Sequence, residues 1–230
     1  MPTWSSDEEL FAIARRELFP AVVGDVMDTM GLLHQFLPPA IRPLRDDMVV
    51  LGRAMPVLEA DVFTQIGGSD GNDVMARPFG LMFRALDDLL PNEVYISAGA
   101  SSRYALWGEL MSTRAMQLGA AGAVLDGFSR DTSGILQLGF PTFSHGGYAQ
   151  DQGARGKVID FRTPLEIGAA RIDPGDVLFG DRDGVCVIPR EAEAEAFARA
   201  LEKARGEHLV RQALEAGESA SDAFARFGIM

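Results

Sequence analysis

Three charged residues near the middle of the chain have the types and spacing of a site for an anion and a metal ion. Glu109 opens a predicted helix, and Arg130 and Asp131 follow the hydrophobic segment at residues 122–127. Because a helix and the strand after it are neighbours in an α/β sheet, a short turn brings the two carboxylates together. Paired carboxylates suit Mg²⁺ or Mn²⁺, and a guanidinium binds a substrate carboxylate with two parallel hydrogen bonds. A solvated ion pair and a glutamate placed for the helix dipole would have the same spacing, so the pattern alone leaves both interpretations open.

The start of the same helix adds a feature that favours anion binding. Gly108, Glu109, Leu110 and Met111 form its first turn. Backbone N–H groups in a first turn have no partner within the helix and carry partial positive charge. This end is therefore predicted to face an oxyanion of a substrate.

The elements around these residues alternate between strand and helix patterns. We expect strands at residues 93–99, 122–127 and 140–146, with helices at residues 108–119 and 132–139. Such alternation is typical of an α/β domain with parallel strands. Arg130 and Asp131 then follow the strand at residues 122–127 at its carboxyl end, where such folds tend to bind ligands.

The segments before and after this region complete the expected fold. Helices are predicted at residues 7–17, 21–31, 81–90 and 190–216, a strand with a candidate bulge at Gly52 at residues 48–60, and a long loop at residues 66–80. From residue 156 to residue 189, short strands separated by Pro-Gly and Asp-Gly turns predict hairpins and a sheet packed on a sheet. The helix after residue 190 is expected to end at Gly217.

Composition narrows the class of protein. The chain has 230 residues, 47% of them hydrophobic, and a net charge of −12, which predicts one domain over residues 1–230 and disfavours nucleic acid as a partner. There is no apolar run long enough to span a membrane and no secretory signal pattern, so we expect a cytoplasmic protein without a membrane partner. Cys186, the only cysteine, is expected to be a buried hydrophobe. His34 and His208 lack metal-ligand spacing, while His145 is a candidate substrate contact or a structural hydrogen-bonding residue.

Several motifs resemble the RraA-like family, which includes the 4-hydroxy-4-methyl-2-oxoglutarate aldolases and the regulators of ribonuclease activity A. The matching stretches are WGEL at residues 107–110, the Arg130-Asp131 pair, FPTF at residues 140–143 and PGDVLFGDRDGVCVIP at residues 174–189. The resemblance covers roughly residues 20–217. It implies a swivelling β/β/α domain with N-terminal and C-terminal helices, assembled as a homotrimer or a dimer of trimers.

The resemblance also implies roles for individual residues. Arg130 matches the arginine that binds the pyruvyl group, Asp131 matches the aspartate that holds Mg²⁺ or Mn²⁺, and Glu109 matches the acid that supports the water on that metal. The backbone amides after Gly108, at Leu110 and Met111, correspond to those that meet the pyruvate oxygens. A carboxylate from the neighbouring subunit completes the family's site, and Glu207 is the candidate for it here.

The function implied is that of a class II pyruvate aldolase, a lyase that breaks a 4-hydroxy-2-oxo acid through a metal-stabilised enolate and also decarboxylates oxaloacetate. The chain's lysines, Lys157 and Lys203, are expected in a turn and a surface helix, so a Schiff-base mechanism is disfavoured. The alternatives are a noncatalytic regulator of a ribonuclease and a metal-dependent enzyme acting on another 2-oxo acid.

Two kinds of departure from the family pattern bear on the substrate. The acid at position 109 is Glu where the aldolases commonly have Asp, and Gly134 stands where a further acidic residue often lies. The loops at residues 67–80 and 144–156 also differ from those of the better-known aldolases. We expect the distal end of the substrate to bind at these loops.

Overall fold

A computed structural model describes residues 4–63 and 73–229 of the chain. The chain divides into two compact units, one made of residues 1–33 with 191–230 and the other of residues 34–190. Within the described residues, no helix has the length and apolar character needed to cross a membrane.

The first unit is helical, and local signals explain where its helices begin and end. It contains α1 (Asp7–Glu17), α2 (Pro20–Thr29), α7 (Glu193–Glu215) and α8 (Ala220–Phe227). The Ser6 hydroxyl accepts a hydrogen bond from the Glu9 N–H at the start of α1, and Pro20 occupies the first turn of α2. Gly217 has φ +93° just after α7, as predicted. The helix α8 was not predicted, although Ser219 caps it by accepting from the Asp222 N–H.

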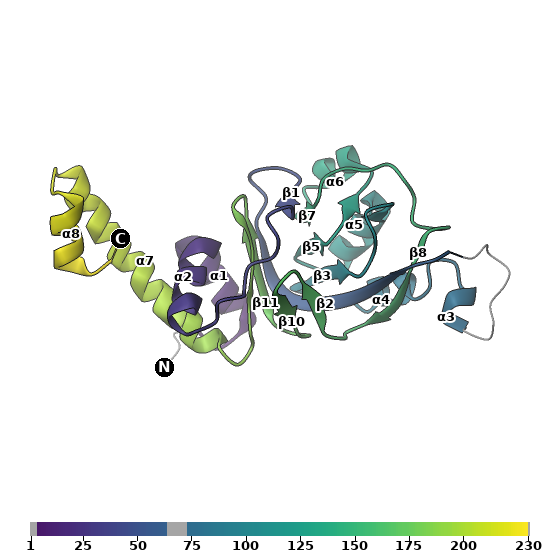
Figure 1. Cartoon of the computed structure of the whole chain (residues 1–230), viewed down its shortest axis with the longest axis horizontal. Helices are drawn as coiled ribbons and strands as arrows, with labels where there is room; N and C mark the ends of the chain where they lie inside the picture. Colours follow the sequence, from purple (N-terminus) through teal and green to yellow (C-terminus); the bar gives the residue numbers. More distant parts are fainter. Residues whose placement is uncertain (1–3, 64–72, 230) are drawn as a thin grey trace. The chain divides into compact units, whose positions relative to one another are not determined.

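The second unit is built on an eight-stranded sheet (Figure 1). Its order is β1-β7-β5-β3-β2-β11-β12, with β8 pairing with β2. The four central strands β7, β5, β3 and β2 run parallel to one another, and β1, β8, β11 and β12 pair antiparallel with their neighbours. The bounds are β1 (Arg42–Pro43), β2 (Val50–Asp61), β3 (Glu93–Ala98), β5 (Gly122–Leu125), β7 (Thr142–Ser144), β8 (Gly156–Phe161), β11 (Val177–Asp181) and β12 (Gly184–Ile188).

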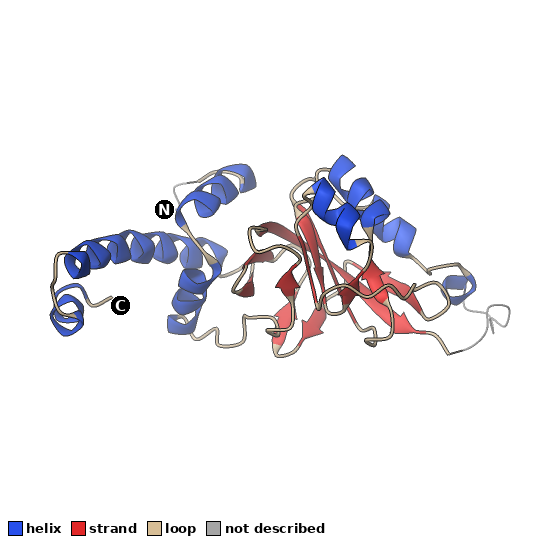
Figure 2. Cartoon of the chain, turned by 90° about the horizontal axis from the view of Figure 1, so that it is seen from above, coloured by secondary structure: helices blue, strands red, loops and turns tan. Residues whose placement is uncertain are grey.

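The two faces of this sheet are covered differently, which produces the β/β/α layering expected from the sequence. One face packs against α4 (Met82–Asp87), α5 (Glu109–Gln117) and α6 (Thr132–Leu138), and Figure 2 shows these helices together on one side of the strands. The other face packs against the hairpin of β9 (Leu165–Ile167) and β10 (Ala170–Ile172). Both layers bury aliphatic side chains completely, which is the main source of stability of such a fold.

One local prediction was wrong, and another was only partly right. The strand β2 has no bulge at Gly52, which pairs in register with Leu178; a Cβ atom there would lie 2.3 Å from the Asn92 carbonyl oxygen, so close packing is what requires the glycine. The irregularity in β2 falls instead between Leu58 and Glu59, opposite β8. The hairpins predicted after residue 156 are confirmed as β9–β10 and β11–β12. The expected packing of sheet on sheet holds for β9–β10 alone, because β8, β11 and β12 join the large sheet.

The predicted position of Lys157 was also wrong. Lys157 lies in β8 rather than in a turn, and its side chain is buried. Its ammonium donates to the carbonyl oxygens of Met75 and Arg77. Met75 lies in the short helix α3 (Asp73–Ala76), and Arg77 directly follows it. The predicted loop at residues 66–80 is described only from residue 73 onward, and the rest of it lies outside the described residues.

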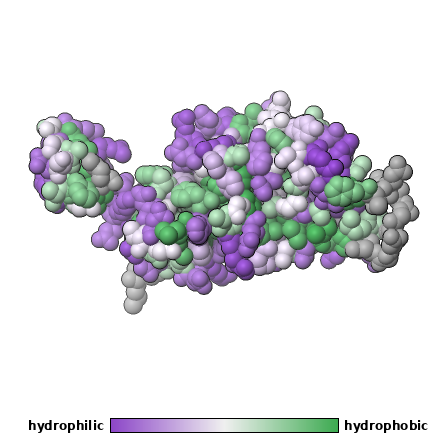
Figure 3. Space-filling model, in the orientation of Figure 1, coloured by the Kyte–Doolittle hydropathy of each residue, from purple (hydrophilic) through white to green (hydrophobic). Residues whose placement is uncertain are grey.

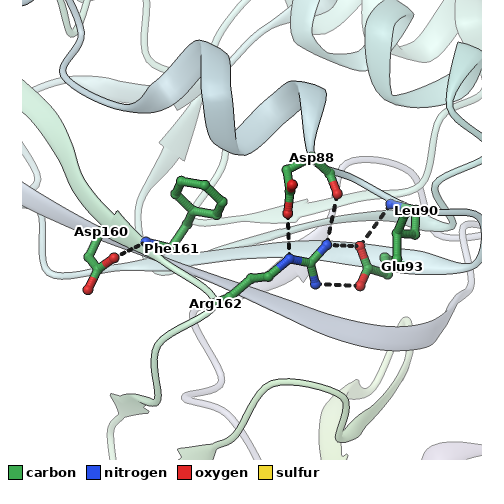
Figure 4. Close-up of polar contacts among 6 residues, drawn as sticks. All are labelled: Asp88, Leu90, Glu93, Asp160, Phe161 and Arg162. Atoms are coloured by element: carbon green, nitrogen blue, oxygen red, sulfur yellow. Dashed lines mark hydrogen bonds and ion pairs between the residues drawn. The ribbon is translucent and has the colours of Figure 1, made fainter.

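An ion-pair cluster fastens the end of α4 to the sheet (Figure 4). The Arg162 guanidinium donates to both Glu93 carboxylate oxygens, at 2.7 and 2.9 Å, and to the side chain and carbonyl of Asp88. Glu93 Oε2 also accepts from the Leu90 N–H at 2.8 Å. These bonds raise the pKa of Arg162 and keep its charge at every accessible pH. The cluster therefore holds α4, one wall of the cavity described next, against the start of β3.

Candidate functional site

A small second sheet brings the predicted site residues together. It consists of β4 (Ala105–Trp107) and β6 (Phe128–Ser129), which run parallel, and the Arg130 N–H donates to the Trp107 carbonyl at 2.8 Å. The two chains therefore leave the same edge as neighbours, one entering α5 through Gly108 and the other entering α6 through Asp131. Arg130 and Asp131 follow β5 at its carboxyl end, as expected, with the short strand β6 between β5 and Arg130.

The backbone of Asp131 is held in an unusual conformation. Its φ and ψ are 54° and 35°, the left-handed region that non-glycine residues seldom adopt, and it forms the N-cap position of α6 without a capping side-chain bond. Its carboxylate points instead toward Gly108, where a Cβ atom would lie 2.7 Å from Asp131 Oδ2. Position 108 therefore needs a glycine for this carboxylate to sit above the start of α5.

The packing of Glu109 explains the two departures from the family pattern together. A Cβ atom at Gly134 would lie 2.4 Å from Glu109 Oε2, so the Glu109 carboxylate occupies the space above that glycine. The longer acid at one position thus fills the space left by the missing side chain at the other. Glu109 is exposed, and among the described residues its carboxylate makes no hydrogen bond or ion pair.

Arg130 is paired with an acid that the sequence analysis did not identify. Its Nη1 lies 2.8 Å from Asp151 Oδ1, and its Nε lies 3.6 Å from Asp131 Oδ2. Asp151 is held in turn by the Gly153 N–H, which donates to its Oδ2 at 2.8 Å. Asp151 belongs to the loop at residues 144–156 that was predicted to meet the distal end of the substrate. A single aspartate in a polar loop gives no indication in the sequence that it pairs with Arg130.

These side chains border a cavity of about 310 Å³ with two unlike sides. Its polar side is formed by Arg130, Asp131, Asp151, Gln152 and the Gly108 backbone. Its apolar side comes from α4, α5, β4 and Phe79, and comprises Phe79, Met82, Phe83, Leu86, Ala105, Leu106, Trp107, Leu110 and Met111. The start of α5 has no side-chain cap, so its first N–H groups are available at the polar side.

A buried acid lies behind the cavity. The Glu59 carboxyl is 2% exposed and accepts a hydrogen bond from Gln152 Nε2 at 2.7 Å, while its other oxygen has no partner among the described residues. Burial without a cation raises the pKa of Glu59 to about 8, so the group is protonated at neutral pH. Burial likewise raises the pKa of Tyr95 on the neighbouring strand β3, and charge on an ionised Glu59 would raise it further.

The structure places the other predicted residues as follows. Gly108, Leu110, Met111, Arg130 and Asp131 all line the cavity, and Glu109 lies beside them on Gly134. The structure does not bring His145 to the cavity; its Nε2 lies 3.4 Å from Asp126 Oδ1 and its ring meets Phe128 edge to face. Glu207 lies on α7 in the helical unit, 3.8 Å from Lys203, and its contribution to a neighbouring subunit stays a prediction.

The donor set fits a hard divalent cation better than zinc. The part of the chain that the structure describes contains no cluster of three or more His, Cys, Asp or Glu that could enclose a metal. Asp131 and Glu109 supply two carboxylates, neither held by a close ion pair: the nearest cation is the Arg130 guanidinium at 3.6 Å from Asp131. Mg²⁺ and Mn²⁺ are bound through one or two carboxylates with several waters retained, whereas structural zinc needs four ligands. Cys186 is fully buried, as predicted, and burial raises the pKa of its thiol.

The family model and the similar proteins point to the same family. A family model described as RraA-like, Aldolase/RraA, matches residues 21–187. A protein of Halalkalibacterium halodurans with a provisional assignment as a 4-hydroxy-4-methyl-2-oxoglutarate aldolase is 30% identical over 200 residues, 86% of each chain. A 4-hydroxy-4-methyl-2-oxoglutarate aldolase of Thermus thermophilus is 27% identical over 62% of this chain and 88% of its own.

The solved structures agree on the fold. The crystal structure of Streptomyces coelicolor RraAS2, described as an unusual member of the RNase ES inhibitor RraA family, has a TM-score of 0.76 at 21% identity. It covers 91% of this chain and 99% of its own. Because the family model spans most of the chain and the same fold recurs in a solved member, the protein belongs to the RraA-like family.

Proposed function

We propose that the protein is a divalent-metal-dependent pyruvate aldolase, a lyase that cleaves a 4-hydroxy-2-oxo acid and also decarboxylates oxaloacetate. The observation that supports this most directly is the convergence of Arg130, Asp131 and the uncapped start of α5 on one cavity. An aldolase needs this combination, because it must bind a carboxylate and stabilise the negative charge that develops on the neighbouring carbonyl oxygen. The names of the relatives are consistent with it.

The chain's own groups divide the work of the reaction. Arg130 binds the C1 carboxylate, with Asp151 holding its guanidinium in place. The N–H groups at the start of α5 face the 2-oxo oxygen and stabilise it as it becomes negative. Asp131 and Glu109 would hold Mg²⁺ or Mn²⁺, which supplies Lewis-acid polarisation of the 2-oxo group when bound.

Bond cleavage follows from the loss of one proton. The C4 hydroxyl gives up its proton to the carboxylate of Asp131 or Glu109, directly or through a water. The C3–C4 bond then breaks, its electron pair enters the enolate of pyruvate, and C4 leaves as a carbonyl compound. A proton added at C3 completes pyruvate. Oxaloacetate reaches the same enolate when its C4 carboxylate leaves as CO₂, which is why both activities are proposed for one site.

The test is release of pyruvate, measured by coupling to lactate dehydrogenase, with oxaloacetate and 4-hydroxy-4-methyl-2-oxoglutarate as substrates. We expect turnover with Mg²⁺ or Mn²⁺, loss of turnover with EDTA, and a decrease in kcat/KM of about 10²-fold in both Arg130→Lys and Asp131→Asn. Arg114→Lys is the matched control, because Arg114 is an exposed arginine of α5 that pairs with Asp87. Unchanged turnover in both site variants would reject the assignment.

The noncatalytic alternative gives the opposite result in the same preparation. A regulator would inhibit a purified ribonuclease stoichiometrically, without a metal requirement and without releasing pyruvate. Its support is the net charge of −12, which complements a basic protein surface. The cavity and the unpaired Glu109 carboxylate have no role in such a protein, and they favour the enzyme.

We also propose that the protein assembles as a homotrimer or a dimer of trimers, with Glu207 contributed to a neighbouring site. Sedimentation equilibrium measures the assembly directly. If Glu207 acts across the interface, Glu207→Gln lowers kcat while leaving the mass of the assembly unchanged. A monomer would contradict the proposed assembly. Unchanged activity of Glu207→Gln would contradict the proposed role of Glu207.

A further inference from the structure

We infer that the substrate of this site carries a single carboxylate and an apolar group on C4, in contrast to the dicarboxylate in the relatives' names. The inference rests on the proposed aldolase function and adds the class of substrate to it. It is drawn from the charges and the apolar surface that line the cavity.

The charged side chains that line the cavity suit a substrate with one carboxylate. Among the described residues that line the cavity, Arg130 is the only cation, and Asp131 and Asp151 are both anions. Arg130 is already matched by Asp151 at 2.8 Å, so one substrate carboxylate completes what it can bind. A second substrate carboxylate would lose its hydration against aliphatic and aromatic side chains, or would face Asp131 and Asp151. A dicarboxylic substrate is therefore poorly matched to these walls.

The apolar side supplies what a hydrophobic substituent needs. Phe83 and Leu110 are 57% and 81% exposed although both line the cavity, so a ligand placed there removes large apolar surfaces from water. Figure 3 shows that hydrophobic residues also reach the surface at several places on the unit of residues 34–190. The indole N–H of Trp107, the one polar group of that wall, already donates to Ser112 Oγ at 2.7 Å. The wall consequently offers a ligand contact area and no hydrogen bonds from these side chains.

The wall is also fixed in shape before a ligand arrives. Phe79 has φ +60°, which is strained for an aromatic residue, and its ring meets that of Phe83 edge to face with centroids 5.6 Å apart. The next residue, Gly80, lies so close to β8 that a Cβ atom would be 2.2 Å from the Val158 carbonyl oxygen. The Leu81 N–H donates to that same carbonyl at 2.9 Å. Strain held by such bonds is typical of a preorganised ligand surface.

These features define the substrate by its chemistry. It is a 4-hydroxy-2-oxo acid whose C4 bears an aryl group or a longer alkyl chain, and cleavage yields pyruvate and an apolar aldehyde. The reaction balances without a co-reactant, because the proton lost from the C4 hydroxyl is replaced by one gained at C3. The carboxylate end lies at Arg130, and the substituent lies between α4 and the first turn of α5.

Binding of compounds that cannot be cleaved tests this class separately from the chemistry. 2-Oxo-4-phenylbutanoate and 2-oxoglutarate both lack the C4 hydroxyl and differ in a phenyl group against a carboxylate. With Mg²⁺ present, isothermal titration should show the phenyl compound binding about 30-fold more tightly, the effect of burying one aromatic ring. Turnover of 4-hydroxy-2-oxo-4-phenylbutanoate should exceed that of 4-hydroxy-4-methyl-2-oxoglutarate by a similar factor in kcat/KM.

Charge placed on the wall should reverse the preference. Phe83→Arg and Leu110→Arg each introduce a cation on the apolar side, so both should weaken the phenyl compound and strengthen 2-oxoglutarate by about tenfold. Leu90→Arg is the matched control, because Leu90 is 56% exposed and lies outside the cavity lining. Circular dichroism of each variant establishes that it is folded, and Phe83→Leu, which retains an apolar side chain, should keep the preference for the phenyl compound.

The outcomes separate the two proposals. Equal or tighter binding of 2-oxoglutarate by the unaltered protein, with pyruvate still released from a 4-hydroxy-2-oxo acid, would overturn the substrate class and leave the aldolase in place. Arginine variants with the unaltered preference would also overturn it. If none of the three cleavable compounds (4-hydroxy-2-oxo-4-phenylbutanoate, 4-hydroxy-4-methyl-2-oxoglutarate and oxaloacetate) released pyruvate, the aldolase and the substrate class would be rejected together.

Discussion

The buried carboxyl of Glu59 makes a sharp prediction about stability and pH. Its pKa is raised from 4.5 to about 8 by burial, although Gln152 donates a hydrogen bond to it. A raised folded-state pKa means that the folded protein favours the protonated form. The contribution of Glu59 to stability is therefore fully present below pH 4.5 and is lost as the pH rises to 8.

The magnitude follows from the size of the shift. One pKa unit corresponds to about 1.4 kcal/mol, so the full change is about 5 kcal/mol, of which about 2 to 3 kcal/mol falls between pH 5 and pH 7. Glu59→Gln removes this dependence, since an amide stays neutral and its carbonyl oxygen can still accept from Gln152. The free energy of unfolding of the variant minus that of the unaltered protein should therefore rise by about 2 to 3 kcal/mol from pH 5 to pH 7.

Urea denaturation at pH 5, 6, 7 and 8 measures this difference. Glu202→Gln is the control, because it makes the same change of residue type at an exposed position on α7. The reasoning would be refuted by a Glu59→Gln difference that is flat from pH 5 to pH 8, because a flat difference means that Glu59 titrates alike in the folded and unfolded chain.

Four further outcomes are expected. Gly134→Ala should lower kcat/KM for oxaloacetate about tenfold or more by displacing Glu109, with the melting temperature nearly unchanged; full activity would contradict the packing of Glu109. Asp151→Ala should raise KM about tenfold with a smaller effect on kcat, because Arg130 loses the group that orients it, and an unchanged KM would argue against that role. Cys186 should react with a thiol reagent only after denaturation, and rapid labelling of the native protein would show that it is accessible. Arg162→Met should reduce the free energy of unfolding in urea by about 2 kcal/mol, because the carboxylate it pairs with stays buried; no loss would mean that water replaces the guanidinium.

Short-range features of the chain could be read from the sequence. The cap at Ser6 and the stop at Gly217 depend on bonds between residues at most a few positions apart, so the residue types alone predicted where α1 begins and α7 ends. The alternation of strands and helices from residue 93 to residue 146 likewise predicted the α/β core. Arg130, Asp131 and Gly108 were found because their residue types and spacing match a family motif.

What lay beyond the sequence depends on contacts between distant segments. Asp151 meets Arg130 across 21 positions, and Gln152 meets Glu59 across 93, so neither pairing has a local signature. The space shared by Glu109 and Gly134 exists only because β4 and β6 set α5 and α6 side by side. Residue types and local bonding thus determined the elements and the reactive groups. The tertiary structure alone decided the apolar wall, the partner of Arg130 and the buried acid, because burial and charge pairing are properties of the space that packed segments enclose.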